Sequence, residues 1–213
     1  MTPLYRFEKK RRQAGALQKM STSIAKSETL LEVALAPFDI VRQVGLVIGF
    51  SLLTALSAQI VIPTGFVPIT GQTFAVLLTG ALLGSRLGAI TMIVYLIEGA
   101  SGLPFFYGGG AGLGHLFGPT GGYLLSFPAA AFITGAFAEQ GWDRKFLTAV
   151  AAMFVGSLLI MVCGWLWFSY LTRTSPLVAF QFTVLKFIPG DIIKILLAAA
   201  VLPTGWKLLK RPR

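Results

Sequence analysis

Charged residues are scarce in this chain: they make up 12% of its 213 residues, whereas soluble globular domains carry roughly 25%. Hydrophobic residues account for 55% of the sequence, and the mean hydropathy is +0.76. A chain of this composition has too few charges to cover a soluble domain. It predicts an integral membrane protein.

Cysteine and histidine are nearly absent, with one residue of each, Cys163 and His115. A single cysteine cannot build a disulfide framework, and the pair is too few for a Cys/His zinc site. The sequence also contains no Gly-x-x-x-x-Gly-Lys-Ser/Thr phosphate loop, which excludes the usual nucleotide cradle. We expect no cofactor, so energy for any transport would have to come from partner proteins.

Enzyme motifs are missing as well, because neither Gly-x-Ser-x-Gly nor His-Glu-x-x-His occurs. Ser101 and His115 could be imagined as the pair of an intramembrane protease, but nothing in the sequence fixes one beside the other. A membrane-embedded enzyme is therefore a weak alternative. A stand-alone pore or facilitator is harder to exclude from sequence.

The net charge of +10 lies at the two chain ends and in short loops. This placement is typical of charges that set membrane topology, and we expect no nucleic-acid partner. Residues 1–42 form a basic tail without the apolar region of a signal peptide. Thr29 and Glu32 have capping-box spacing, so the segment to Leu35 is either a short interfacial helix that Pro37 ends or a disordered stretch.

Six apolar segments follow, to be compared with the roughly 20 residues that cross a bilayer. They cover residues 43–62, 68–83, 87–103, 118–138, 145–170 and 177–202. The second and third are short, and the sixth is interrupted around Pro189, where we expect a break followed by a new helix. The predicted fold is an all-α integral membrane protein: a bundle of six transmembrane helices in residues 43–206, followed by a basic tail at 207–213.

The basic residues orient this bundle. The N-terminal tail, Arg86, the 143–145 loop and the 207–213 tail carry most of them, whereas the 63–71 and 104–119 loops contain no Lys or Arg. Positive charge marks the cytoplasmic side. Both termini are therefore expected in the cytoplasm, in a multi-pass protein of a bacterial inner membrane.

Two charges lie inside the last apolar segment, Asp191 and Lys194, three residues apart and so on one helical face. Pro189 suits the first turn of a helix, which puts Asp191 where the helix dipole favours a carboxylate. Charges within a span usually face a cavity and serve a function. The alternative is an internal ion pair that helps the bundle pack.

Polar, aromatic and glycine residues gather at the same outer level of the predicted bundle. Each alone could serve a turn or helix packing; together with Asp191 and Lys194 they favour a ligand site. The candidates are Thr70, Gln72, Phe106, Tyr107, Gly109, Gly110, Thr120 and Tyr123. The glycine-rich stretch 108–114 is predicted to act as a lid that becomes ordered when ligand binds.

Four ordered motifs give this arrangement a family likeness. They are Pro68-Ile69-Thr70-Gly71-Gln72-Thr73-Phe74, the segment from Tyr95 through Gly99 to Phe106, Gly118-Pro119-Thr120-Gly121-Gly122-Tyr123-Leu124, and Phe187-Ile188-Pro189-Gly190-Asp191-Ile192-Ile193-Lys194. The chain from Val44 to Pro203 resembles the BioY family, the substrate-binding (S) component of energy-coupling-factor biotin transporters. Glu98, where an apolar residue is anticipated, and the long basic tail depart from the family pattern.

The resemblance implies high-affinity capture of biotin from outside, energised by a transmembrane T component with two ATPases. Asp191 would accept from the ureido N–H groups, Lys194 would donate to the ureido oxygen, and aromatic rings would cover the bicycle. Because Asp191 would repel the biotin carboxylate, we expect the ureido head to enter first. The small residues Gly45, Gly49, Ser51 and Ala55 are predicted to meet the T component, with packing inside the bundle as the alternative.

Overall fold

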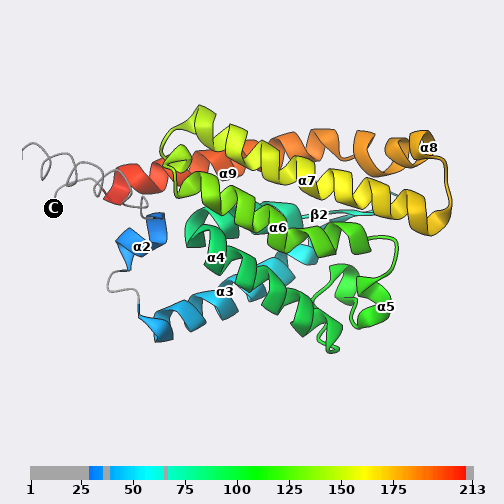
Figure 1. Cartoon of the computed structure of the whole chain (residues 1–213), viewed down its shortest axis with the longest axis horizontal. Coiled ribbons are helices and arrows are strands. Elements are labelled where there is room, and N and C mark those ends of the chain that lie inside the picture. Colours follow the sequence, from blue (N-terminus) through cyan, green and yellow to red (C-terminus); the bar gives the residue numbers. More distant parts are fainter. Residues whose placement is uncertain (1–28, 36–38, 65–66, 210–213) are drawn as a thin grey trace, which may run out of the picture.

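The computed structural model describes residues 29–35, 39–64 and 67–209 as a helical bundle (Figure 1). Five helices in this part of the chain are long and apolar enough to cross a membrane: α3 (Ile40–Ala58), α4 (Gln72–Ala100), α6 (Gly121–Ala138), α7 (Phe146–Thr172) and α9 (Ile188–Leu209). Shorter elements are α2 (Leu30–Ala34), η1 (Tyr107–Gly109), α5 (Leu113–Leu116), η2 (Trp142–Arg144), α8 (Pro176–Phe180) and the π-helical η3 (Gln181–Leu185). Most of the two predicted basic tails lies outside the described residues.

Helix α4 contains the two short segments expected at 68–83 and 87–103, and it bends sharply between them. The break is Gly84, with φ 83° and ψ 178°, a conformation essentially reserved for glycine. Beyond it the two halves fold back on each other, because Gln72 Nε2 lies 2.6 Å from the hydroxyl of Tyr95. In a straight helix these residues would be about 34 Å apart at 1.5 Å per residue.

Helix α6 holds this break in place from the side. Glu139, directly after α6, accepts hydrogen bonds from the backbone N–H and the hydroxyl of Ser85, at 2.8 and 2.9 Å. The carboxylate thus satisfies the free N–H end of the second half of α4, where the helix dipole favours negative charge. A Cβ on Gly135 would come within 2.4 Å of Ser85 N, so α6 approaches α4 closely only because this residue is glycine.

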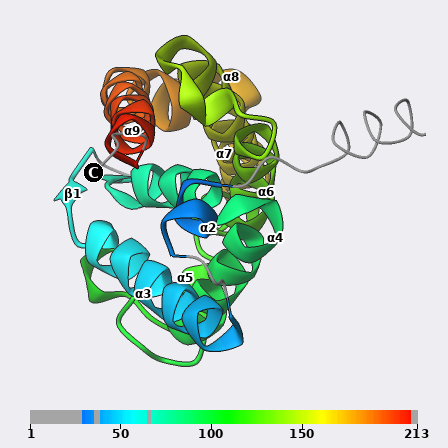
Figure 2. The same ribbon diagram turned by 90° about the vertical axis from the view of Figure 1, so that its left-hand side faces the viewer.

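The helices differ in how far they are enclosed. Helix α6 packs between α4 and α7, and 61% of its most apolar 18-residue stretch is buried. The corresponding share for α3 is 17%. Helix α9 packs against α7 and α4, and α3 lies at the edge of the bundle (Figure 2). One long face of α3 is therefore left without a partner in the described chain.

The chain is mostly helical, as expected, and a small hairpin is the exception among the described residues. Val61–Ile62 (β1) pairs antiparallel with Ile69–Thr70 (β2) in a small hairpin just before α4. All four of these residues are β-branched, and Pro63 and Pro68 adjoin the two strands, which favours extended backbone over helix. The hairpin delays the start of the helix from the predicted residue 68 to Gln72.

The two ends of the bundle carry different features. Helix α2, the Gly84 break, η2 and the C-terminal end of α9 share one end, which we call the basic end. Its described basic residues are Arg42, Arg86, Arg144, Lys145 and Lys207. The hairpin, η1, α5 and η3 lie at the opposite end, which we call the loop end.

The capping box predicted at Thr29 is present at the basic end. Thr29 N donates to Glu32 Oε2 at 2.8 Å, and the short helix α2 follows, so the helical alternative for this segment is confirmed. Leu30 packs against Gly205 near the end of α9. Pro37, expected to end the helix, lies outside the described residues.

Candidate functional site

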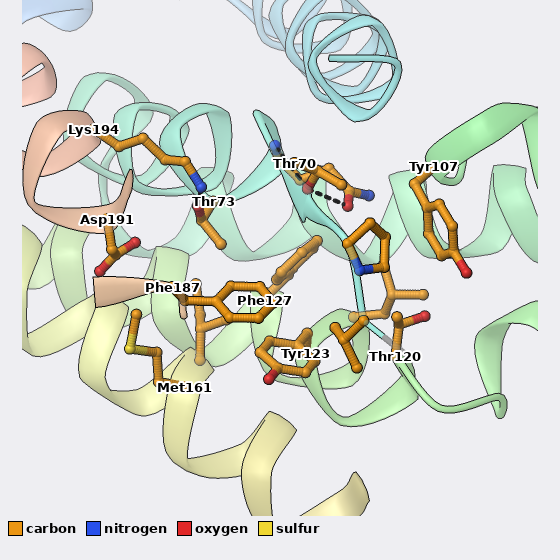
Figure 3. A pocket seen from close by; sticks show the side chains of 15 residues that line it. Thr70, Thr73, Tyr107, Thr120, Tyr123, Phe127, Met161, Phe187, Asp191 and Lys194 are labelled. Carbon is orange, nitrogen blue, oxygen red and sulfur yellow. Dashed lines mark hydrogen bonds between the residues drawn. The ribbon is translucent and has the colours of Figure 1, made fainter. Parts of the chain in front are cut away.

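A pocket opens between the hairpin, α4, α6, α7 and α9 near the loop end (Figure 3). It holds about 530 Å³ of space free of protein atoms, counted out to its mouth. Seven of the predicted site residues line it: Thr70, Gln72, Tyr107, Thr120, Tyr123, Asp191 and Lys194.

Three other predicted residues lie outside the pocket lining. Phe106 is fully buried and packs edge-on against Tyr95, with ring centroids 5.8 Å apart. Gly109 and Gly110 belong to the turn beside it, where Gly110 O accepts from Phe106 N at 2.9 Å. These residues shape the loop that carries Tyr107.

Asp191 and Lys194 form the charged end of the pocket, and each has a hydroxyl partner from another helix. The hydroxyl of Ser157 on α7 donates to Asp191 Oδ2. Lys194 Nζ donates to Thr73 Oγ1 on α4 at 2.9 Å. Among the described residues no direct ion pair joins the two charges. They are held side by side by separate anchors.

This anchoring leaves hydrogen-bonding capacity directed at the pocket. Asp191 is 7% exposed, and its Oδ1 has no hydrogen-bond partner among the described side chains. The ammonium of Lys194 has three N–H groups, of which Thr73 takes one. The pocket therefore offers one charged acceptor and a charged donor next to each other, in a setting that water reaches poorly.

Aromatic rings form the wall next to this charged end. Tyr123 stacks with Phe187 at a centroid distance of 5.9 Å and an interplanar angle of 18°. The hydroxyl of Tyr123 donates to Thr183 O at 2.7 Å, so the ring presents its face rather than its hydroxyl. Phe127 and Met161 extend the apolar surface (Figure 3). A flat, apolar ligand body fits such a wall.

A chain of hydrogen bonds stiffens the opposite wall. Thr70 donates to Gln72 Oε1 at 2.9 Å, and Gln72 Nε2 donates to Tyr95 at 2.6 Å. The Tyr95 hydroxyl in turn donates to Phe105 O at 3.0 Å. These bonds tie the hairpin, both halves of α4 and the loop after α4 into one unit. Gln72 keeps one N–H for a ligand.

Sequence reasoning missed part of the lining. The additional residues are Val67, Pro68, Thr73, Leu124, Phe127, Ile160, Met161 and Phe187, with Ser157 behind Asp191. Four of them fall inside the quoted motifs, which is the signal that could have identified them: Pro68, Thr73, Leu124 and Phe187. Ile160, Met161 and Ser157 belong to α7, whose apolar sequence offers no local clue to which face meets the pocket.

The four small residues predicted to meet a partner are divided between two faces of α3. A Cβ on Gly45 or Gly49 would have no neighbouring atom within 4 Å, so both lie on the open face. Ser51 and Ala55 are 0% and 6% exposed and point into the bundle, where α3 packs against α4. The open face and the packed face are thus both lined by small residues.

Comparison with known proteins connects this architecture to one family. A model of the BioY family matches residues 20–211. A probable biotin transporter BioY of Pyrococcus horikoshii is 40% identical over 160 residues, covering 75% of this chain and 93% of the relative. Biotin transporter BioY2 of Lactococcus lactis is 35% identical, covering 70% and 81%.

A solved structure extends the likeness to three dimensions. The crystal structure of the S-component for biotin from an ECF-type ABC transporter superposes with a TM-score of 0.72 at 26% identity, over 81% of this chain and 93% of that one. The matched family segment, residues 20–211, contains the hairpin, all five long helices and every residue of the pocket. This chain belongs to the BioY family.

Proposed function

We propose that this protein takes up biotin, binding it in the Asp191–Lys194 pocket from the outer side of the membrane as the S component of an energy-coupling-factor transporter. The observation that carries the proposal is the pair of separately anchored charges, Asp191 on Ser157 and Lys194 on Thr73, at the end of an aromatic pocket. The family membership agrees with it.

The chemistry of biotin matches this arrangement. Its ureido head has two N–H donors and one strong acceptor, its body is an apolar bicyclic thioether, and its tail ends in a carboxylate. Asp191 Oδ1 accepts from a ureido N–H, and Lys194 donates to the ureido oxygen. Tyr123, Phe127 and Phe187 enclose the bicycle.

The orientation of the ligand follows from the charges. With the ureido head at Asp191, the carboxylate extends toward Tyr107 and Thr120, which lie at the other end of the pocket (Figure 3). The reverse orientation would bring two carboxylates together in a poorly hydrated space, which is unfavourable. The nearby Lys186 does not line the pocket, and its ammonium donates to Thr64 O at 3.3 Å.

The proposal includes a topology. The basic end faces the cytoplasm, so that both termini are cytoplasmic in a multi-pass protein of the cell membrane. The two halves of α4 count as two short spans, which raises the five long helices to six transmembrane segments. The loop end with the pocket then faces outward.

The proposal also includes partners. The chain has no phosphate loop, so a transmembrane T component and ATPase subunits supply the energy. The open face of α3, with Gly45, Gly49 and the exposed Leu52 and Leu56, is where a helix of the T component can approach closely. The protein is not an enzyme and is proposed to work without a cofactor, since biotin is its cargo.

The direct test is calorimetric titration of the purified chain, in detergent or nanodiscs, with biotin. We expect saturable binding of one biotin per chain with no chemical change to the ligand recovered afterwards. Saturable binding of an unrelated small molecule with no heat from biotin would contradict the proposal. Release of a modified biotin would favour the enzyme alternative.

A further inference from the structure

Gln59, the first residue after α3, makes three hydrogen bonds with its side-chain amide. Nε2 donates to Ala55 O in α3 and to Phe106 O, both at 3.1 Å, and Oε1 accepts from Gly109 N at 3.0 Å. The two loop bonds join residues 47 and 50 positions apart in sequence. One side chain thus connects α3 to the turn formed by residues 106–110, called here the Tyr107 turn.

The two bonds from Gln59 bracket Tyr107, which lies between Phe106 and Gly109 in sequence and lines the pocket. The backbone of the turn allows this contact, because Gly108 and Gly109 have φ angles of 63° and 73°, which residues other than glycine rarely adopt. In this turn the N–H of Gly109 points at Gln59 and donates to its Oε1. Gln59 thus holds the turn on both sides of a residue that lines the pocket.

Other contacts fix the rest of the loop from a different direction. Phe106 is buried by its ring against Tyr95 and His115, and Tyr95 bonds Phe105 O. Gly110 N closes the turn on Tyr107 O at 3.1 Å. The ring of Tyr107 also lies against His115, with centroids 4.7 Å apart. Loss of Gln59 would therefore leave Phe106 anchored and would loosen Tyr107, which would keep only its contacts with His115 and Gly110.

Helix α3 is the least enclosed of the long helices, 17% buried, with an open face at Gly45 and Gly49. Gln59 sits at its loop end, so a displacement of α3 pulls directly on the Tyr107 turn. We propose that Gln59 is a positioning residue that latches the Tyr107 turn over the ligand pocket, so that movement of α3 opens the pocket. This inference rests on the proposed function, because the ligand that it retains is biotin.

The test uses three variants of the full chain in nanodiscs. Gln59→Leu removes all three bonds at similar volume, and Gln59→Glu keeps the acceptor for Gly109 N but loses the amide donors. Gln181→Leu is the matched control, because Gln181 is an exposed glutamine in η3 with no side-chain hydrogen bond among the described residues. The readouts are association and dissociation rates of radiolabelled biotin and millisecond hydrogen exchange of residues 106–110, with thermal unfolding as a check on folding.

We expect Gln59→Leu to dissociate biotin about five- to tenfold faster, the effect of one to two neutral hydrogen bonds. The association rate and the unfolding temperature should change little, and exchange at Gly109 should rise with or without ligand. Gln59→Glu should retain slow exchange at Gly109 with an intermediate dissociation rate, and Gln181→Leu should behave as the wild type.

The possible failures are distinguishable. A wild-type dissociation rate in folded Gln59→Leu, or unchanged exchange at Gly109, would overturn the latch while leaving biotin binding intact. An equal acceleration by Gln181→Leu would also overturn it. If the wild-type chain bound no biotin, the proposed function would fail, and exchange at Gly109 in the ligand-free variants would still decide whether Gln59 holds the turn.

Discussion

Replacing Asp191 by asparagine tests the charged end of the pocket with the smallest change of shape. Ser157 donates to one carboxylate oxygen, so the asparagine oxygen will take that position and turn its NH₂ group toward the ligand. The ureido N–H then meets a donor instead of an acceptor. Lys194, three residues further on, also loses the neighbouring negative charge that partly balances it.

The expected size follows from the bond that is lost. A hydrogen bond to a charged group contributes about 1.5–3 kcal/mol. Its loss corresponds to a roughly 10- to 150-fold larger dissociation constant for biotin. Neutralising Asp191 removes the cost of burying a carboxylate but leaves Lys194 without its neighbouring negative charge, and because these effects oppose each other the stability of the ligand-free variant should change little. Loss of binding without loss of stability separates a ligand role from a packing role.

The assay is equilibrium titration of the detergent-solubilised proteins with biotin, together with thermal unfolding without ligand. Asp39→Asn is the control, because Asp39 caps the start of α3 at the basic end, away from the pocket. An unchanged dissociation constant in folded Asp191→Asn would refute the reasoning. A large loss of stability in the ligand-free variant would show instead that Asp191 mainly serves the bundle.

Three further outcomes are expected. Converting the biotin carboxylate to a neutral amide should weaken binding modestly, whereas replacing the ureido oxygen by an imino group should weaken it severely; competition titrations that gave the opposite ranking would place the carboxylate at Asp191. Gly84→Ala should lower the free energy of unfolding by about 1–3 kcal/mol, since Gly84 has φ 83° and a Cβ would lie 2.7 Å from Glu139 Oε1; thermal melts should show no such loss for Gly45→Ala, where a Cβ meets nothing within 4 Å. Burial raises the pKa of the Asp143 carboxyl, against the opposing effects of the Trp206 hydrogen bond and of Arg144. The Asp143 carboxyl therefore binds its proton more tightly in the folded state than in the unfolded state. This protonation stabilises the fold at low pH, and the stabilisation is lost as pH rises through the folded pKa. The unfolding temperature of Asp143→Asn relative to wild type should consequently increase as the pH rises above about 4, the ordinary pKa of an aspartate, and a pH-independent difference would contradict this.

Local sequence patterns determined the class of the protein and the start of its last helix. Long apolar runs with few charges identify membrane helices without reference to any neighbour, because the lipid is the partner. The start of α9 at Ile188, next to Pro189, was predictable for a similar reason, since a proline suits a first helical turn. The spacing of Asp191 and Lys194 sufficed to place both on one face of that helix.

The partners of these residues were decided by the tertiary structure. Ser157 and Thr73 reach Asp191 and Lys194 from helices 34 and 121 positions away in sequence. Such contacts depend on how α7 and α4 rotate about their axes. A uniformly apolar helix does not encode that rotation locally, because every face of it is equally soluble in lipid.

The same reason explains the remaining differences. The sequence predicted two separate short spans, and the fold of α4 at Gly84 depends on a carboxylate, Glu139, contributed by another helix. Phe106 and Tyr107 are adjacent aromatics, yet one is buried in the core and the other lines the pocket. Composition and helical periodicity thus determined where this chain resides and which charges matter, while the packing of distant helices decided which atoms those charges face.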